Sequence, residues 1–301
     1  MDFEALIVGG AMAGASAALV LGRCGRRVLV CDDGHPRNAA ARGVHGFLTR
    51  DGLAPAEFLR VARREVLVYP SVTWWDVRVE AVERLAEGFR LRTSDGRTAT
   101  GATVLLATGL VDELPEIPGV RQFWGRGVYV CPFCDAWEVR GRRFVVLGRT
   151  PDLYDFVLEL RQWSQDLVIA TDGAWPFSAE QAAHLERLGL PLLRAKVVAL
   201  EGQEERLERV RLADGTVLDT SVVFLTTTQH QRSPLADQLG CPPEPGGAVP
   251  VRESDCAAAD RVWVAGNAST GLQMAVIAAA EGVKAAHAIN ERLVADGLRG
   301  T

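Results

Sequence analysis

The chain has 301 residues, of which 48% are hydrophobic and 24% are charged, a composition close to that of ordinary globular proteins. This length suits one large domain or two modest ones, and it excludes a peptide, a largely disordered chain or a fibrous repeat. The formal net charge is −5, and the 33 Lys and Arg residues are scattered among 38 Asp and Glu residues, which argues against a nucleic-acid-binding surface.

The chain shows no targeting or membrane segment. Its first residues reach a glycine-rich stretch without the basic start or cleavage site of a signal peptide. The apolar runs are far shorter than the about 18 residues that a membrane span requires. Six cysteines include only one closely spaced pair, so a secreted disulfide framework is not expected. These features predict a cytoplasmic protein with no membrane contact.

The N-terminal residues have the pattern of a dinucleotide-binding βαβ unit. A short strand over residues 5–8 precedes the glycine-rich turn of residues 9–14, and residues 15–21 suit a helix. A second strand over residues 27–31 ends at Asp32, about 20 positions past the turn. This spacing predicts a nucleotide-binding fold at the start of the chain.

The residues of this turn have separate predicted roles. Gly9 suits the tight turn, Gly14 allows close packing of the helix, and Asp32 can accept a hydrogen bond from a ribose hydroxyl. The N-terminus of the helix would face a pyrophosphate. The middle glycine of the pattern is replaced by Ala11, which weakens the match.

Later segments repeat one order of elements. Residues 89–93 alternate in polarity, Asp95-Gly96 predicts a hairpin turn, and residues 102–109 follow as a buried strand. The second occurrence consists of a strand at 144–147, a helix ending at Leu160, strands at 167–170 and 207–212, a turn at Asp214-Gly215 and a strand at 222–225. A weak internal duplication, with two nucleotide folds in one chain, explains this repetition.

The second copy lacks the small residues of a nucleotide turn. Thr150 and Leu153 occupy positions that would need small side chains, and Thr150 with Pro151 predicts an ordinary N-cap and first helical residue. Asp152 places a carboxylate where a pyrophosphate would sit, and the next strand ends at Asp172 without a pair of arginines. These residues argue against pyridine nucleotide binding in the second copy.

The sequence Cys131-Pro132-Phe133-Cys134 lies directly before the second copy. It could be a zinc half-site, two structural cysteines or a dithiol/disulfide couple. Zinc needs further ligands at suitable spacing, which Cys241 and Cys256 do not supply, so no metal site is predicted. A CxxC pair beside a dinucleotide fold favours redox chemistry. Asp135 follows and could donate and accept the proton, although an exposed turn carboxylate is the alternative.

The C-terminal part predicts one more strand and a long helix. Residues 261–265 form the strand, which ends at Gly266-Asn267, and an alanine-rich helix extends to His287. The N-terminus of that helix could face a flavin ring, where its dipole would favour the negative charge that develops on reduction. A plain packing helix is the alternative.

Together these motifs resemble the low-molecular-weight thioredoxin reductases and the related dithiol oxidases of the flavoprotein disulfide reductase superfamily. The resemblance spans nearly the whole chain and depends on the order of the nucleotide turn, LLATG at Leu105–Gly109, CPFCDAWE at Cys131–Glu138 and VAGN at Val264–Asn267. It implies an α/β fold of two Rossmann-like domains, each with a three-layer ββα arrangement, the second inserted in the first. Residues 1–115 and 246–301 would form the FAD-binding domain, and residues 116–245 an inserted NAD(P)-binding-like domain with the CxxC pair.

The resemblance also implies roles for individual residues. Cys134 would react with the flavin, Cys131 would exchange with the substrate, and Asp135 would move the proton. The family usually has Asp where this chain has Asn267, which keeps an acceptor, adds a donor and removes a charge. The implied cofactor-binding residues are Gly9, Gly10, Ala13 and Gly14 at the pyrophosphate, Asp32 at the ribose, Val79 at the adenine, and Asn38, His45, Ala107, Thr108, Gly109, Gly266, Asn267, Gln273 and Met274 elsewhere along FAD.

The resulting hypothesis is an FAD-dependent thiol–disulfide oxidoreductase that uses the Cys131/Cys134 pair. Its expected partners are a thioredoxin-like protein or a small dithiol or disulfide, with an unidentified electron donor or acceptor, and the resemblance implies a homodimer. NADPH is not expected at the usual site, and some members of the family carry a second FAD. The Pro132-Phe133 pair resembles the dithiol-oxidase branch and its bacterial relatives more than it resembles the thioredoxin reductases proper. A dithiol oxidase that uses oxygen and a non-catalytic flavin redox sensor are the alternatives.

Overall fold

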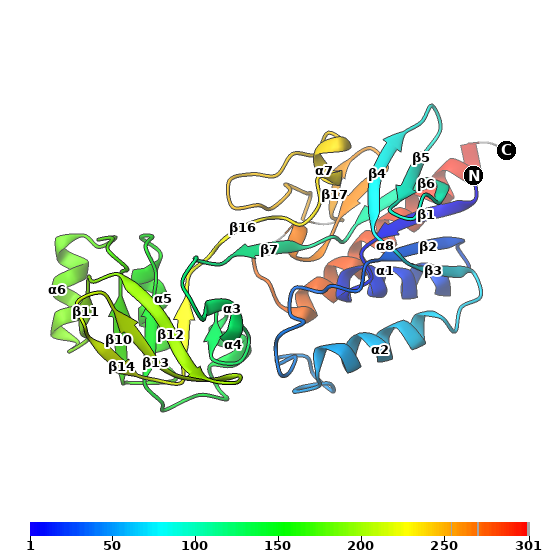
Figure 1. Ribbon diagram of the computed structural model, residues 1–301. Helices are drawn as coiled ribbons and strands as arrows, with labels where there is room; N and C mark the ends of the chain where they lie inside the picture. The colour runs from blue at the N-terminus through cyan, green and yellow to red at the C-terminus, as the bar shows by residue number, and fades with distance from the viewer. Residues whose placement is uncertain (254, 270, 300–301) are drawn as a thin grey trace. The chain divides into compact units, whose positions relative to one another are not determined.

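The computed structural model describes residues 1–253, 255–269 and 271–299 (Figure 1). The chain divides into two compact units. Unit 1 consists of Met1–Ala39, Gly46–Val111 and Gln229–Thr301, and unit 2 of Ala40–His45 and Asp112–Thr228. Each unit contains a parallel sheet with helices, and the predicted fold class, two Rossmann-like α/β domains in one chain, is confirmed.

Unit 1 is built on an eight-stranded sheet of order β17-β18-β6-β1-β2-β3, to which the β4–β5 hairpin is joined through β6. Its parallel strands are β1 (Phe3–Val8), β2 (Val28–Asp32), β3 (Val72–Asp76), β6 (Thr98–Leu106) and β18 (Val262–Val264). The antiparallel strands are β4 (Val79–Arg84), β5 (Phe89–Thr93) and β17 (Ala257–Ala259). The predicted N-terminal βαβ unit therefore forms the centre of this sheet.

The helices of unit 1 cover both faces of the sheet. They are α1 (Met12–Arg23), α2 (Pro55–Val66), α7 (Leu235–Gln238), α8 (Ala275–Arg299) and the 3₁₀ helix η1 (Gly266–Ala268). Alanines of α1 and α8 pack with β1 and β2 in one hydrophobic cluster, while β4, β5 and α7 pack on the opposite face. Small side chains allow α1 and α8 to approach closely, since a Cβ atom at Gly282 would lie 2.0 Å from the carbonyl oxygen of Ala13.

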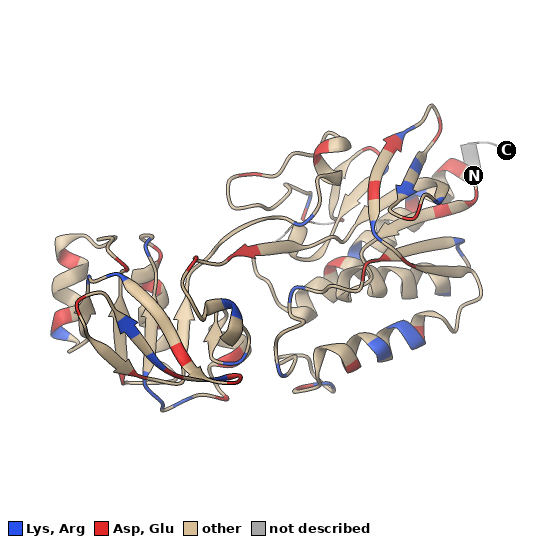
Figure 2. Ribbon diagram, viewed as in Figure 1, with Lys and Arg blue, Asp and Glu red and all other residues tan. Residues whose placement is uncertain are grey.

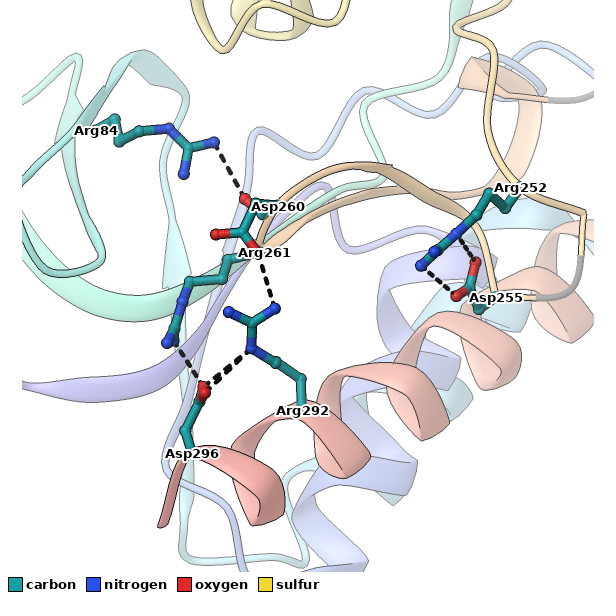
Figure 3. Close-up of polar contacts among 7 residues, drawn as sticks. All are labelled: Arg84, Arg252, Asp255, Asp260, Arg261, Arg292 and Asp296. Atoms are coloured by element: carbon teal, nitrogen blue, oxygen red, sulfur yellow. Dashed lines mark hydrogen bonds and ion pairs between the residues drawn. The ribbon is translucent and has the colours of Figure 1, made fainter. Parts of the chain in front are cut away.

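A group of ion pairs joins α8 to the turn between β17 and β18 (Figure 3). Arg292 donates to Asp260 Oδ1 at 2.8 Å and to Asp296 Oδ1 at 3.2 Å. Arg261 contacts the other oxygen of Asp296 at 2.9 Å. Arg84, on β4, donates to the carbonyl oxygen of Asp260 at 3.1 Å. Asp296 therefore holds two arginines, one from its own helix and one from the turn.

Replacing Asp296 with alanine is expected to lower the free energy of unfolding by about 1 kcal/mol, because two partly exposed ion pairs are lost together. Urea denaturation measures this change. Glu291→Ala is the matched control on the same helix, since Glu291 pairs only weakly with exposed His287 at 3.6 Å. Equal losses in the two variants would show that the ion pairs of Asp296 contribute nothing of their own.

Unit 2 has a three-layer arrangement. Its parallel sheet has the order β11-β10-β9-β15-β8, and an antiparallel sheet has the order β12-β13-β14. One face of the parallel sheet packs against β12 and β13, and the other packs against α5 and α6. The elements are β8 (Val128–Tyr129), β9 (Phe144–Leu147), β10 (Leu167–Ala170), β11 (Leu192–Leu193), β12 (Val197–Gln203), β13 (Arg206–Leu212), β14 (Val217–Asp219), β15 (Val223–Leu225), α3 (Val120–Phe123), α4 (Pro132–Asp135), α5 (Leu153–Leu160) and α6 (Ala179–Arg187).

Two paired strands, β7 (Leu110–Glu113) and β16 (Thr228–Gln231), carry the chain between the units. The second boundary was expected at residue 245/246, but the structure places it at 228/229. The physical reason is that Leu235, Ala236 and Leu239 of the α7 region join the hydrophobic core of unit 1. The segment Ala40–His45 is also grouped with unit 2, which the sequence did not indicate.

Charge is distributed without a single dominant sign. Figure 2 shows basic and acidic residues interspersed along the helices and strands of each unit. Among the described residues, no helix is long and apolar enough to cross a membrane. The same residues contain no group of three or more His, Cys, Asp or Glu side chains suited to a metal ion.

Candidate redox and cofactor sites

Backbone atoms leave no room for a side chain at Gly9, in the turn between β1 and α1, or at Gly14, in the first turn of α1. Gly9 has a φ angle of +102°, and a Cβ atom there would lie 2.3 Å from the carbonyl oxygen of Ala107. A Cβ atom at Gly14 would lie 1.8 Å from the carbonyl oxygen of Gly9. The backbone is therefore packed as tightly as a dinucleotide turn requires.

The start of α1 presents backbone donors. Its N-cap residue is Ala11, without a side-chain capping bond, and its first turn, which includes Ala13, contains no acidic residue. Uncapped N–H groups at a helix N-terminus suit a phosphate. Asp32 lies at the end of β2 and its Oδ1 accepts a hydrogen bond from the Gly10 N–H at 3.0 Å. These residues fit the pyrophosphate and ribose of FAD.

Residues from the two ends of the chain meet beside this turn. Gly266 has a φ angle of +76°, and a Cβ atom there would lie 3.0 Å from the Cβ atom of Ala13. The Gly266 N–H donates to Glu281 Oε2 at 2.7 Å, and Ser269 Oγ donates to the same oxygen at 3.1 Å. Glu281 of α8 thus fixes the segment that contains Asn267, a role that the sequence analysis missed.

Gln273 and Met274 lie directly before α8 and are held by other parts of unit 1. The amide groups of Gln273 and Gln229 exchange two hydrogen bonds, at 3.2 and 2.5 Å, and Arg37 also donates to Gln273 Oε1. A Cβ atom at Gly46 would lie 2.8 Å from Met274 Cε. The Gln229–Gln273 pair was not predicted, because amide pairs between distant residues leave no local signal in a sequence.

The remaining predicted cofactor residues lie in different surroundings. Val79 is buried at the start of β4, and Ala107, Thr108 and Gly109 follow β6, where the Ala107 N–H donates to the carbonyl oxygen of Val8 at 2.8 Å. Asn38 is exposed in the loop after β2. His45 is grouped with unit 2, where its Nε2 lies 3.7 Å from Glu138 Oε1.

Cys131 and Cys134 form a disulfide with a Cα–Cα distance of 5.2 Å. The short helix α4 begins directly after Cys131, and the N–H groups of Cys134 and Asp135 both donate to the carbonyl oxygen of Cys131 at 3.2 Å. Both cysteines are half-buried.

The other cysteines are less suited to redox exchange. Burial raises the pKa of the Cys31 thiol to about 12 and that of Cys256 to about 11, and it also raises the pKa of Cys241. Since the thiolate is the reactive form, these thiols are poor nucleophiles. Cys24 is exposed at the end of α1 and has no cysteine partner.

The carboxyl group of Asp135 has a strongly altered proton affinity. Burial, and to a smaller extent the negative charge of Glu138, raise its pKa to about 7, while His45 acts in the opposite direction. Burial also raises the pKa of neighbouring Tyr129, with a smaller contribution from Asp135. A carboxyl group that titrates near neutral pH beside a CxxC pair can both donate and accept a proton.

Two exposed aromatic residues are close in sequence to the disulfide: Phe133 lies between the two cysteines, and Trp137 follows them. Phe133 is 56% exposed and packs edge-on against Trp163, with ring centroids 5.7 Å apart. Trp137 is 62% exposed, and the guanidinium of Arg140 lies 3.9 Å from its ring centroid.

The turn after β9 differs from the one after β1. Arg149 Nε donates to Asp172 Oδ2 at 2.8 Å, and the Val197 N–H donates to Asp172 Oδ1 at 2.7 Å. The prediction that Thr150 caps the helix was wrong: α5 begins at Leu153 with Asp152 as its N-cap residue. The cause is a separate turn, in which the Leu153 N–H donates to the carbonyl oxygen of Thr150.

A family model for pyridine nucleotide-disulphide oxidoreductases matches residues 3–282. The chain belongs to this family. This oxidoreductase is 31% identical over 272 residues to a probable thioredoxin reductase of Arthroderma benhamiae, a match that covers 81% of this chain and 67% of that relative.

Two solved structures are similar to this oxidoreductase along nearly its full length. The crystal structure of the putative thioredoxin reductase TrxB from Bacillus anthracis has 31% identity and a TM-score of 0.93, and covers 98% of this chain and 99% of the other. The crystal structure of HlmI has 34% identity and a TM-score of 0.94, and covers 99% and 95%. The expected class, a thioredoxin reductase-like disulfide oxidoreductase that binds FAD, is confirmed.

Proposed function

We propose that this oxidoreductase transfers electrons between FAD and an external dithiol or disulfide through the Cys131/Cys134 pair. The observation that carries the proposal is the half-buried disulfide on α4, directly followed by Asp135, whose pKa is about 7. FAD, when bound, would supply the two-electron acceptor or donor for this pair. The proposed cofactor residues are those of the β1–α1 turn, Asp32 and the segments before α8.

In the oxidising direction, the external dithiol is oxidised and the Cys131/Cys134 pair is reduced. A thiolate of an external dithiol attacks Cys131, the Cys131–Cys134 bond breaks, and a mixed disulfide forms. The second thiol then displaces Cys131, so that the external molecule leaves as a disulfide and the pair has gained two electrons. Asp135 would protonate the departing Cys134 thiolate and later take the proton back. The reverse sequence reduces an external disulfide.

We further propose that NADPH is not used at the usual position in unit 2. The hydrogen bond from Arg149 to Asp172 occupies a guanidinium that could otherwise contact a phosphate, and the Val197 N–H donates to the other oxygen of the same carboxylate. The buried carboxylate of Asp172 would also repel a 2′-phosphate. Without NADPH, the electrons would enter from a dithiol, with oxygen as the final acceptor, or from a protein donor.

Anaerobic titration of the purified, FAD-loaded protein tests the proposal. Flavin absorbance at equal concentrations of dithionite, NADPH, dithiothreitol and reduced ferredoxin is compared. We expect bleaching by dithionite and dithiothreitol and none by NADPH. Rapid bleaching by NADPH would contradict the proposed electron source. Many turnovers of dithiol with consumption of oxygen would identify a dithiol oxidase. Absence of turnover with every donor would instead support a non-catalytic redox sensor.

The stoichiometry and the assembly are separate proposals. We propose one FAD per chain, in unit 1, and a value near two in released-flavin assays would instead support a second FAD. The external partner is proposed to be a thioredoxin-like protein or a small dithiol or disulfide, and the assembly a homodimer. A cytoplasmic location is proposed from the four free cysteines, which are typical of a reducing compartment.

A further inference from the structure

The edge strand β3 contacts the turn between β1 and α1. It pairs in parallel with β2, and Asp76 at its end is the register partner of Asp32. A Cβ atom at Gly10 would lie 2.3 Å from Cζ2 of Trp74 and 2.9 Å from the Cβ atom of Asp32. Gly10 therefore has no room for a side chain, because Trp74 and Asp32 fill the space beside it.

The indole of Trp74 thus adjoins the residues proposed for the ribose of FAD. The Gly10 N–H donates to Asp32 Oδ1 at 3.0 Å, a hydrogen bond that orients the carboxylate at the end of β2. Cζ2 and Cη2 of Trp74 are the two atoms nearest to the position that a Cβ atom of Gly10 would take. The indole therefore limits how far the Gly10 backbone can shift toward β3.

Arg63 of α2 contacts both this indole and the end of β3. Its guanidinium carbon lies 5.0 Å from the centroid of the Trp74 ring. The same guanidinium donates to both carboxylate oxygens of Asp76, at 2.5 and 2.8 Å. Because Asp76 is the register partner of Asp32, Arg63 also offsets one of two negative charges at neighbouring strand ends. Packing and an ion pair therefore act together on Trp74.

The next residue, Trp75, has similar contacts on the opposite face of the sheet. Trp74 packs on the hydrophobic cluster of α1 and α8, whereas Trp75 packs on the cluster of β4, β5 and α7. The guanidinium of Arg97 lies 4.4 Å from the Trp75 ring centroid and pairs with Asp95 at 2.7 Å. Two adjacent tryptophans are thus held by arginines in the same way, and Trp74 is the one that contacts Gly10.

We propose that Trp74 is a positioning residue for the adenosine half of FAD, with Arg63 and Asp76 holding its indole in place. The indole supports the backbone of Gly10 and, through the hydrogen bond from Gly10, the carboxylate of Asp32. The inference deepens the proposed function and rests on it for the assignment of the ribose to Asp32. Trp74 acts through Gly10 and does not have to touch the cofactor.

Titration of the deflavinated full chain with FAD tests this role. Trp74→Leu removes the flat ring and is expected to weaken FAD binding about tenfold, because the support of the Gly10 backbone is lost. Trp75→Leu is the matched control, since it makes the same change at the next residue of β3, and FAD affinity should stay within about twofold of wild type. Unchanged affinity in Trp74→Leu, or equal losses in both variants, would overturn the proposal.

ADP is the second probe, because it contains the adenosine and pyrophosphate of FAD without the flavin. Its affinity is measured by competition with FAD. Trp74→Leu should weaken ADP by the same factor as FAD, about tenfold. A loss of FAD affinity with unchanged ADP affinity would mean that Trp74 acts on the flavin half, and the proposal would fail.

Two partly exposed arginines provide variants that leave the tryptophans in place. Arg63→Gln removes the ion pair with Asp76 and should weaken both FAD and ADP about threefold. Arg97→Gln is its control and should change neither affinity. The same affinities in both arginine variants would contradict the proposal even if Trp74→Leu did not fold. Failure of the proposed function would appear differently, as wild-type protein that binds FAD and ADP but whose flavin is reduced by no dithiol.

Discussion

Replacing either Cys131 or Cys134 with serine is expected to lower dithiol turnover by about three orders of magnitude or more, since removing one member of a reacting group disables the whole group. The two cysteines form a single disulfide on α4, and the other cysteines are buried with raised pKa values or, as with Cys24, lie outside the pair. Steady-state consumption of dithiothreitol by FAD-loaded protein measures the loss.

The two variants should also differ from each other. The resemblance assigns Cys134 to the flavin, so Cys131→Ser alone is expected to gain a long-wavelength absorbance band. Cys24→Ser is the matched control, because it makes the same chemical change at an exposed thiol outside the pair. If both Cys131→Ser and Cys134→Ser kept full turnover, the disulfide would be structural and the proposed function would fail.

Replacing Gly14 with alanine is expected to have the second large effect, about a hundredfold loss of FAD affinity. The new Cβ atom would lie 1.8 Å from the carbonyl oxygen of Gly9, and relief requires the turn itself to move. Overpacking of this kind costs about 2–3 kcal/mol, which corresponds to that change in affinity when the strain falls on the bound state. Fluorescence titration of deflavinated protein with FAD measures it.

Gly297→Ala provides the control for this substitution. Gly297 lies in α8 of the same unit, and a Cβ atom there would meet nothing within 4 Å. Alanine should be accepted, and it should favour the helix slightly. If the Gly14→Ala variant folded normally and bound FAD with unchanged affinity, the β1–α1 turn would not hold the cofactor. The proposed assignment of the FAD pyrophosphate to this turn would then fail.

Much of the fold could be predicted because its signals are local. The strand at 144–147 and the strand at 167–170 have the bounds observed for β9 and β10, since short apolar runs between turn residues are typical of buried parallel strands. The Asp95-Gly96 and Asp214-Gly215 turns have positive φ angles at glycine, as the pattern predicts. The predicted start of α5 was wrong because Thr and Asp are both favourable N-cap residue types. Only the turn that the folded chain forms selects Asp152 over Thr150.

The candidate sites likewise contain local motifs, which the sequence indicates, and contacts between distant residues, which it does not. Glycine turns and the CxxC pair have fixed spacing, so the sequence indicates them directly. The hydrogen bonds from Arg149 to Asp172 and from Gly266 to Glu281 connect residues whose types are common everywhere, and only the folded backbone brings them together. His45 was expected along FAD from the order of motifs, whereas its contact with Glu138 depends on where the segment Ala40–His45 packs.

The pairing of β7 with β16 has a consequence for the modular history of this chain. Asp112 and Thr227 bond across the pair at 3.1 Å, so the entry and exit of the long insertion are neighbours. A gene fragment for residues 112–228 would therefore have its two junctions, at residues 111/112 and 228/229, side by side in the structure. Such a graft would still take residues 40–45 from its host, so the transplanted unit would be completed by a segment of the recipient.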